Sequence, residues 1–378
     1  TGRLASLPRK ILVVIQFTIS LALIIGTLIV FRQIQHTKNR PAGYDRERLV
    51  MVEMATPDFY GKFNVLQHAL KEKNLIVEMA ESSSPLTAVW SNSSGFEWEG
   101  KDPNLTTDFA TVKVTHDYGK TIAWQLESGR DFSRDYSTDS AGMILNQAAV
   151  QFMGMDDPVG KTIRWGSRDY RIIGTVHDVV MSSPFQPVKP TVYLLDEENV
   201  NWIIFQLNPR LSTATTLAGI EEAFGKIIPN APFAYQFADA EYAAKFAIEE
   251  RIGKAATLFA IFAIAISCLG VFGLASFVAE QRTKEIGIRK VVGASVFQLW
   301  KLLSTDFLLL VLIACLVASP VAYYALDNWL NQYAYRTSIP WWIFGFAIAG
   351  ALLLTLMVVS FQTFKAARMN PVDSLRDE

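Results

Sequence analysis

Four long runs of apolar residues dominate the pattern along the chain, and they span residues 11–31, 255–279, 302–326 and 341–364. Each has about 20 residues or more, the length that an α-helix needs to cross the ~30 Å hydrocarbon core of a bilayer. Long buried helices of a soluble protein are the alternative, but four such runs in one chain favour membrane spans. Because no small-residue cleavage site follows the first run, we expect it to be a retained span rather than a signal peptide.

Polar and small residues interrupt these runs only mildly. Gln16, Thr18, Ser20 and Ser267 can bond to their own helix or to a neighbouring one. Three glycines are expected to let neighbouring helices approach closely: Gly26, Gly270 and Gly273.

The stretch 32–254 has the shorter periodicities of a domain in water. Two strand–helix–strand units are predicted, at residues 49–53, 63–73 and 75–79, and at residues 202–207, 212–227 and 233–237. The intervening residues 86–195 are rich in Gly, Ser, Asp and Trp, with short alternating stretches that favour strands. The predicted fold is therefore an α-helical membrane protein with four transmembrane helices plus a large α+β domain, made of two βαβ-like units with a mostly β insertion.

Basic residues in the short segments predict the orientation. They cluster before the first run, between the second and third, and after the fourth: Arg3, Arg9, Lys10, Arg282, Lys284, Arg289, Lys290, Lys365, Arg368 and Arg376. We therefore expect segments 1–10, 280–301 and 365–378 to be cytoplasmic. The domain 32–254 and the short loop 327–340 are then external. The basic cluster Arg32–Arg40 runs against this, but long domains translocate largely regardless of charge.

Composition and motifs argue against an enzyme. The 378 residues are 51% hydrophobic and 19% charged, which suits a mixed membrane and soluble protein, and the net charge of −1 gives no basic field for nucleic acid. The four histidines are widely spaced, His177-Asp178 is an isolated pair, and both cysteines lie in apolar runs. No metal-ligand spacing, nucleophile motif or phosphate-binding loop is present in the sequence. We expect no metal and no cofactor, and we expect ATP to bind a partner chain.

The segment 283–295 (TKEIGIRKVVGAS) is densely charged between two apolar runs. Glu285 and Arg289 are spaced to stabilise a helix, as are Glu280 and Lys284. Gly287 predicts a bend and Gly293 the end of a turn. Apolar positions, namely Ile286, Val291 and Val292, suit a groove on a soluble partner. Anchoring of the basic residues to anionic lipid is the alternative, but it does not require the ordered acid–base pattern or the glycines.

This segment resembles the signature that FtsX-like permeases, the MacB-type membrane subunits of ABC transporters, carry between their second and third spans. The stretch 366–376, with its Asn-Pro-x-x-Ser-Leu-Arg pattern, resembles the family's cytoplasmic tail. Pieces of the external domain are also similar: 127–133 (ESGRDFS), 144–150 (ILNQAAV), 157–161 (DPVGK) and 172–176 (IIGTV). The resemblance covers essentially the whole chain, including the order of one span, a large domain and three spans.

The resemblance implies a non-catalytic permease subunit in the bacterial inner membrane, with both termini cytoplasmic and the large domain periplasmic. It implies a cytoplasmic ABC ATPase as partner, whose ATP-driven closure moves the spans and, through them, the periplasmic domain. The implied cargo is a peptide, an antibiotic or a lipoprotein, with a periplasmic adaptor as a further partner. The start at Thr1 and the run 43–50 resemble a subgroup that carries the four-span unit twice. A homodimer and the second half of a duplicated permease therefore both remain open.

The residues expected to contact the ATPase are Arg282, Lys284, Glu285, Ile286, Gly287, Arg289, Lys290, Val291, Gly293 and Ala294. The tail is either a frayed polar end or a second contact, made by Asn370, Pro371, Ser374, Leu375 and Arg376. The alternative function is a membrane-tethered periplasmic ligand sensor without ATP coupling, which the lack of a cytoplasmic output domain disfavours. A channel is disfavoured because Asp306 is the only charged residue within the four runs.

Overall fold

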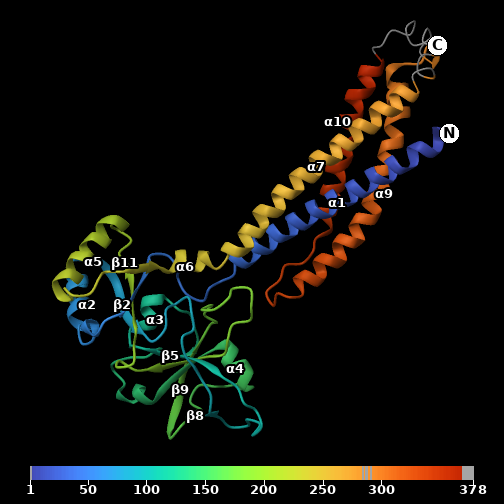
Figure 1. Cartoon of the computed structure of the whole chain (residues 1–378). Coiled ribbons are helices and arrows are strands. Elements are labelled where there is room, and N and C mark those ends of the chain that lie inside the picture. Colours follow the sequence, from blue (N-terminus) through green and yellow to red (C-terminus); the bar gives the residue numbers. More distant parts are fainter. Residues whose placement is uncertain (1, 283–284, 286–287, 290–291, 368–378) are drawn as a thin grey trace. The chain divides into compact units, whose positions relative to one another are not determined.

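The structure is a computed structural model that describes residues 2–282, 285, 288–289 and 292–367 (Figure 1). The chain divides into two compact units. One, here called the helical unit, combines residues 1–37 with residues 248–378. The other, here called the sheet unit, is the stretch Lys38–Ala247.

The helical unit is built on four long helices, α1 Gly2–Lys38, α7 Ala247–Gln281, α9 Val296–Leu330 and α10 Trp341–Ala367. All four are long and apolar enough to cross a membrane, which confirms the fold class predicted from the hydrophobic pattern. Helix α1 continues past the end of its apolar run through polar residues as far as Lys38.

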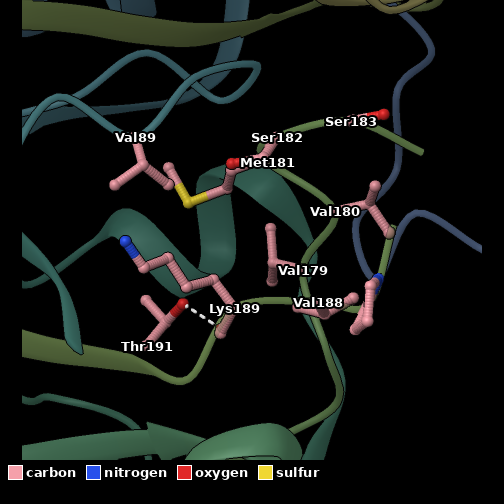
Figure 2. Close-up of a pocket in the computed structure, with 10 residues that line it drawn as sticks. Val89, Val179, Val180, Met181, Ser182, Ser183, Val188, Lys189 and Thr191 are labelled. Atoms are coloured by element: carbon pink, nitrogen blue, oxygen red, sulfur yellow. Dashed lines mark hydrogen bonds between the residues drawn. The ribbon is translucent and has the colours of Figure 1, made fainter. Parts of the chain in front are cut away.

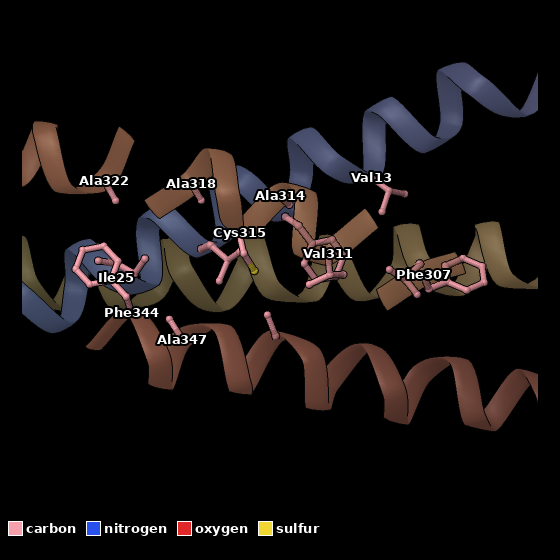
Figure 3. Close-up of a cluster of buried hydrophobic side chains, with 14 of the residues drawn as sticks. Val13, Ile25, Phe307, Val311, Ala314, Cys315, Ala318, Ala322, Phe344 and Ala347 are labelled. Atoms are coloured by element: carbon pink, nitrogen blue, oxygen red, sulfur yellow. The ribbon is translucent and has the colours of Figure 1, made fainter. Parts of the chain in front are cut away.

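The four helices pack around a shared apolar core (Figure 3). Small residues on α9, such as Ala314 and Ala318, are fully buried in it and leave room for Ile25 of α1 and Phe344 of α10. This arrangement is typical of membrane helices, whose association depends on close packing rather than on exclusion from water.

A polar strip joins α1 to α7 within this core. The hydroxyls of Ser20 and Ser267 are 2.9 Å apart. A Cβ atom at Gly270 would lie 2.3 Å from Oε1 of Gln16, so the expected close approach at Gly270 is confirmed. The same expectation was wrong at Gly273, where a Cβ would meet nothing within 4 Å. At Gly26 a Cβ would make only ordinary contact with Leu326, at 4.0 Å.

The end of α1 near Lys38 is joined to the connection between α9 and α10. The side chain of Gln33, 1% exposed, donates to the carbonyl of Tyr335 at 2.8 Å. Its Oε1 accepts from the backbone N–H of Thr337 at 2.8 Å. The rings of His36 and Tyr335 stack, with centroids 4.6 Å apart. Two backbone groups of the connection therefore have a side chain of α1 as their hydrogen-bond partner.

The sheet unit contains a twelve-stranded mixed sheet. Its strands are β1 Leu49–Glu53, β2 Ile76–Ser82, β3 Asn92–Ser93, β4 Phe96–Glu97, β5 Phe109–Val114, β6 Leu126–Gly129, β7 Gly142–Asn146, β8 Thr162–Trp165, β9 Arg168–Val176, β10 Thr191–Leu195, β11 Trp202–Leu207 and β12 Tyr235–Phe237. Its α-helices are α2 Phe63–Glu72, α3 Tyr118–Ile122, α4 Gln147–Met153, α5 Thr213–Ile227 and α6 Ala238–Ala244.

The two predicted βαβ-like units are present and interleaved. The strand order is β12-β1-β11-β2, and each neighbouring pair is antiparallel. Strand β11 of the second unit therefore separates β1 from β2, while β1 separates β11 from β12. Helices α2 and α5 bury Leu66, Leu70, Ile220 and Phe224 in one core cluster with the strands. Each unit thus contributes one helix and two strands to a single layer of helices packed on a sheet.

The insertion contains strands β3–β10 and has its own core, with Phe109, Leu145 and Ile172 fully or almost fully buried. Its sheet continues that of the interleaved units through one residue pair between β2 and β5, Ser82 with Val114. Two hydrogen bonds flank this pair: Ser83 N–H to Lys113 O at 2.8 Å and Thr115 N–H to Glu81 O at 3.1 Å. The strand ladder between the two parts is therefore short, and α3 of the insertion adds contacts with β2 and β11.

Candidate functional site

The segment 280–301, which connects α7 to α9, is the candidate site, and an ion pair joins its first part to α9. Helix α7 ends at Gln281, and the next residue, Arg282, continues its hydrogen bonding by donating its N–H to Val278 O at 3.0 Å. The Nη2 atom of Arg282 lies 3.0 Å from Oδ2 of Asp306 on α9. The two side chains are 34% and 45% exposed, so water screens the pair. Its consequence is geometric: it joins the start of the segment to α9.

Within the segment, the predicted acid–base pair is present. The Nη2 of Arg289 donates to Oε1 of Glu285 at 2.7 Å, one helical turn away, with both side chains about half exposed. The N–H of Val292 donates to Ile288 O at 3.0 Å, as in a helix. The acid stands on the N-terminal side, which is the favourable order. The other predicted pair includes Lys284, which lies outside the described residues.

A turn at Gly293 separates this helical stretch from α9. Gly293 has φ +95°, a conformation that favours glycine, and the N–H of Ala294 donates to Arg289 O at 2.8 Å. The predicted turn end is confirmed. Ser295 then caps α9: its hydroxyl accepts from Gln298 N–H at 3.3 Å, and Gln298 Oε1 accepts from Ser295 N–H at 3.0 Å. This capping box fixes where the helix begins.

The first turns of α9 are packed into the helical unit. Leu299 and Leu303 are 2% and 4% exposed and cluster with Val278 of α7. The indole Nε1 of Trp300 donates to Ser360 Oγ on α10 at 2.7 Å. The segment is therefore continuous with side chains that pack α7, α9 and α10 together.

Apolar side chains of the segment are exposed. Ile288 is 56% exposed, Val292 82% and Phe297 67%, with the Phe297 ring stacked on Trp300 at 5.4 Å between centroids. Val292 was predicted as an apolar contact. Ile288 and Phe297 were missed, although the spacing of Ile288 and Val292 places both on one helix face and was visible in the sequence.

The remaining predicted site residues fall outside the described part of the chain. They are Lys284, Ile286, Gly287, Lys290 and Val291 in the segment, and Asn370, Pro371, Ser374, Leu375 and Arg376 in the tail. The structure describes Arg282, Glu285, Arg289, Gly293 and Ala294, and among these Arg289 contacts both Glu285 and Ala294.

The sheet unit shows no metal site: among the described residues, no group of three or more His, Cys, Asp or Glu side chains is placed to hold an ion. The His177-Asp178 pair has a structural partner instead. Oδ1 of Asp178 accepts from the N–H of Ala148 in the first turn of α4 at 2.9 Å. Burial raises the pKa of Asp178 above its usual value.

Comparison with known proteins places this arrangement in a family. Residues 11–223 match the MacB-like periplasmic core domain, and residues 257–371 match the FtsX-like permease C-terminal region. The first match covers more than half of the chain. The chain therefore belongs to the MacB-like periplasmic core domain family, and it is an ABC permease of the FtsX/MacB type, a multi-pass membrane protein with a periplasmic-type domain.

Individual relatives are distant. The chain is 24% identical to the macrolide export ATP-binding/permease protein MacB of Neisseria gonorrhoeae, over 79% of this chain and 47% of that protein. It is 22% identical to the uncharacterized ABC transporter permease YknZ of Bacillus subtilis, over 72% of this chain and 71% of that protein. The chain thus spans about half the length of the MacB relatives that it matches.

Among solved structures, the chain is similar to the periplasmic region of MacB from Actinobacillus actinomycetemcomitans. The identity is 14% and the TM-score 0.39, over 56% of this chain and 97% of that one.

Proposed function

We propose that this permease receives mechanical work from a cytoplasmic ABC ATPase at the segment 280–301 and transmits it through its four helices to a periplasmic sheet unit. Export or release of a peptide, antibiotic or lipoprotein cargo would follow from that motion. The observation that carries the proposal is the exposed, ion-paired helical stretch around Glu285 and Arg289, attached at both ends to packed helices.

The contact itself combines apolar and charged groups. Ile288 and Val292 are exposed next to the ion pair, and a helix face of this kind fits a groove on a soluble protein. The basic residues of the segment support a cytoplasmic location for it. A second copy of the four-helix unit, as a homodimer or as the other half of a duplicated permease, would complete the assembly with two ATPases. The chain itself performs no chemistry in this proposal.

Replacing Ile288 and Val292 by Ser tests the proposal against lipid anchoring, because the charge of the segment stays unchanged. We expect the double variant to lose stimulation of the ABC ATPase that co-purifies with the permease, measured in lipid nanodiscs. Val65→Ser, at an exposed apolar residue of α2, is the matched control and should keep this stimulation. Normal stimulation by the double variant would contradict the apolar contact.

A further inference from the structure

The segment 178–191, between β9 and β10, contains buried apolar residues outside any helix or strand until β10 begins. Val179, Val180 and Met181 are 2–3% exposed, and Phe185 is 6% exposed. A buried segment without a strand partner must find other hydrogen-bond donors for its carbonyl groups. Cationic side chains from two distant parts of the sheet unit supply them.

The first donor comes from residues 38–48, which lead from α1 to β1. Nη1 of Arg40 donates to the carbonyls of Pro184 and Gln186, both at 2.9 Å. The N–H of Val180 donates to Ala42 O at 2.8 Å. At Gly43, with φ +83°, a Cβ would lie 2.1 Å from the carbonyl oxygen of Asp178, so the two backbones are in direct contact.

The second donor is Lys245, which stands two residues before α7. Its ammonium donates to the carbonyls of Met181 and Ser182, each at 2.7 Å, and to that of Thr87. A lysine has three N–H donors, so these three carbonyls match its full capacity. The neighbouring Phe246 packs edge-on against Phe185, with centroids 5.3 Å apart.

The other end of the segment is fixed to β7 and β3 of the same insertion. The side chain of Asn146, at the end of β7, donates to Lys189 O at 3.0 Å and accepts from Thr191 N–H at 2.8 Å. Nζ of Lys189 lies 2.6 Å from Oδ1 of Asn92. Figure 2 shows Val179, Val188, Lys189 and Thr191 around a small cavity beneath the segment.

These contacts attach the insertion to the residues that lead to α1 and α7, in addition to its contacts with β2 and β11. We infer that the segment 178–191 passes motion from both chain connections, those leading to α1 and to α7, into the β-rich insertion, with Arg40 and Lys245 as its positioning residues. Because Arg40 and Lys245 hold the segment to the residues that lead to α1 and α7, movement of those residues would displace the insertion relative to the interleaved units. The inference rests on the proposed function, since it specifies where transmitted motion arrives.

Spin labels at Glu221→Cys on α5 and Asp156→Cys in the insertion measure that displacement, in a full chain with Cys268→Ala and Cys315→Ala. Both labelled positions are exposed. Pulsed EPR distances are recorded in nanodiscs with the co-purified ATPase, without nucleotide and with ATP trapped by vanadate. We expect Arg40→Gln with Lys245→Met to widen the nucleotide-free distance distribution and to abolish the ATP-dependent shift, while ATPase stimulation persists.

Two further variants separate position from general stability. Lys245→Arg keeps charge and donors and should restore the narrow distribution, whereas Lys73→Met removes an exposed lysine of the same unit and should change nothing. An unchanged nucleotide-free distribution in the double variant would overturn the inference, whatever the ATPase does. If the unsubstituted permease does not stimulate the ATPase, that result counts against the proposed function. The inference would still be decided by comparing the nucleotide-free distance distributions with and without the double substitution.

Discussion

The guanidinium of Arg282 lies 3.0 Å from the carboxylate of Asp306, and the pair joins the residue after α7 to the first turns of α9. Asp306 is the only charged residue within the four apolar runs. Asp306 is the fifth residue of the run 302–326, next to the segment, and a carboxylate in such a run usually marks a polar pathway or a partner cation. Asp306 has Arg282 as its partner cation, so its charge helps to hold the segment in position and does not indicate a route for ions.

Reversing this pair should affect coupling more than folding. We expect Arg282→Asp or Asp306→Arg alone to lower stimulation of the partner ATPase several-fold, and the two together to restore most of it. An exposed pair contributes only ~0.2–1 kcal/mol to stability, so the thermal unfolding temperature in detergent should barely change. A doubly reversed variant that is no better than the single ones would show that the pair itself is not required.

Close packing at Gly174 accounts for the glycines in two of the sequence pieces that resemble the family, 127–133 and 172–176. Gly174 pairs across strands with Gly129, and a Cβ at position 174 would lie 2.3 Å from the carbonyl oxygen of Arg130. We expect Gly174→Ala to destabilise the full chain by about 1–3 kcal/mol, because backbone must move. Gly225→Ala, where a Cβ meets nothing within 4 Å, is the control. Equal urea midpoints for both variants would refute this explanation.

Gln33→Leu should loosen the connection between α9 and α10. The substitution leaves the carbonyl of Tyr335 and the N–H of Thr337 without their partner, at a cost of about 1–3 kcal/mol for each group that stays buried. Hydrogen exchange at Thr337 should accelerate, while Gln35→Leu, an exposed neighbour on the same helix, should leave it unchanged. Equal hydrogen exchange at Thr337 in both variants would argue that Gln33 does not hold this connection in place.

Glu81 should make the stability of the sheet unit depend on pH. Burial, with a smaller effect of the Glu197 carboxylate, raises the pKa of Glu81 from 4.5 to about 7. The folded state therefore binds more protons than the unfolded state between these values, and the free energy of unfolding falls as pH rises from 4.5 to about 7. Protonation of Glu81 stabilises the fold at low pH, and this contribution is lost above pH 7.

The substitution Glu81→Gln tests the direction of this pH dependence. We expect the variant to unfold at a higher temperature than the unsubstituted chain at pH 8, and the difference to shrink by pH 5. The pKa of Asp131 is also raised by burial, to about 6, so some pH dependence should remain in the variant below that value. Equal unfolding curves at pH 8 would contradict a buried, unfavourable Glu81 charge.

Local patterns predicted more of this fold than long-range pairing did. Apolar runs indicated the four helices, but not that α1 continues to Lys38, because its last turns are held by Gln33 contacting residues about 300 positions away. Alternation and turn residues indicated the strands of the two βαβ-like units. Their interleaving depends on which strand pairs with which, such as Met51 with Ile204, and no local signal specifies that register.

The features of the candidate site also divide into those that local spacing predicts and those that depend on contacts between helices. The Glu285–Arg289 pair and the turn at Gly293 follow from spacing and glycine conformation. The Arg282–Asp306 pair joins two helices, so spacing along one helix does not reveal it. The Ser295–Gln298 capping box was readable as Ser-x-x-Gln but was overlooked.

The most direct test of ATP coupling compares two exposed ion pairs of the same kind. Glu285 and Arg289 form one in the segment between α7 and α9, and Glu222 and Lys226 form the other on α5. Stimulation of the co-purified ATPase is measured in nanodiscs for each double alanine variant, at matched expression. We predict that Glu285→Ala with Arg289→Ala abolishes stimulation while Glu222→Ala with Lys226→Ala retains it. Full stimulation by the first variant would contradict the account.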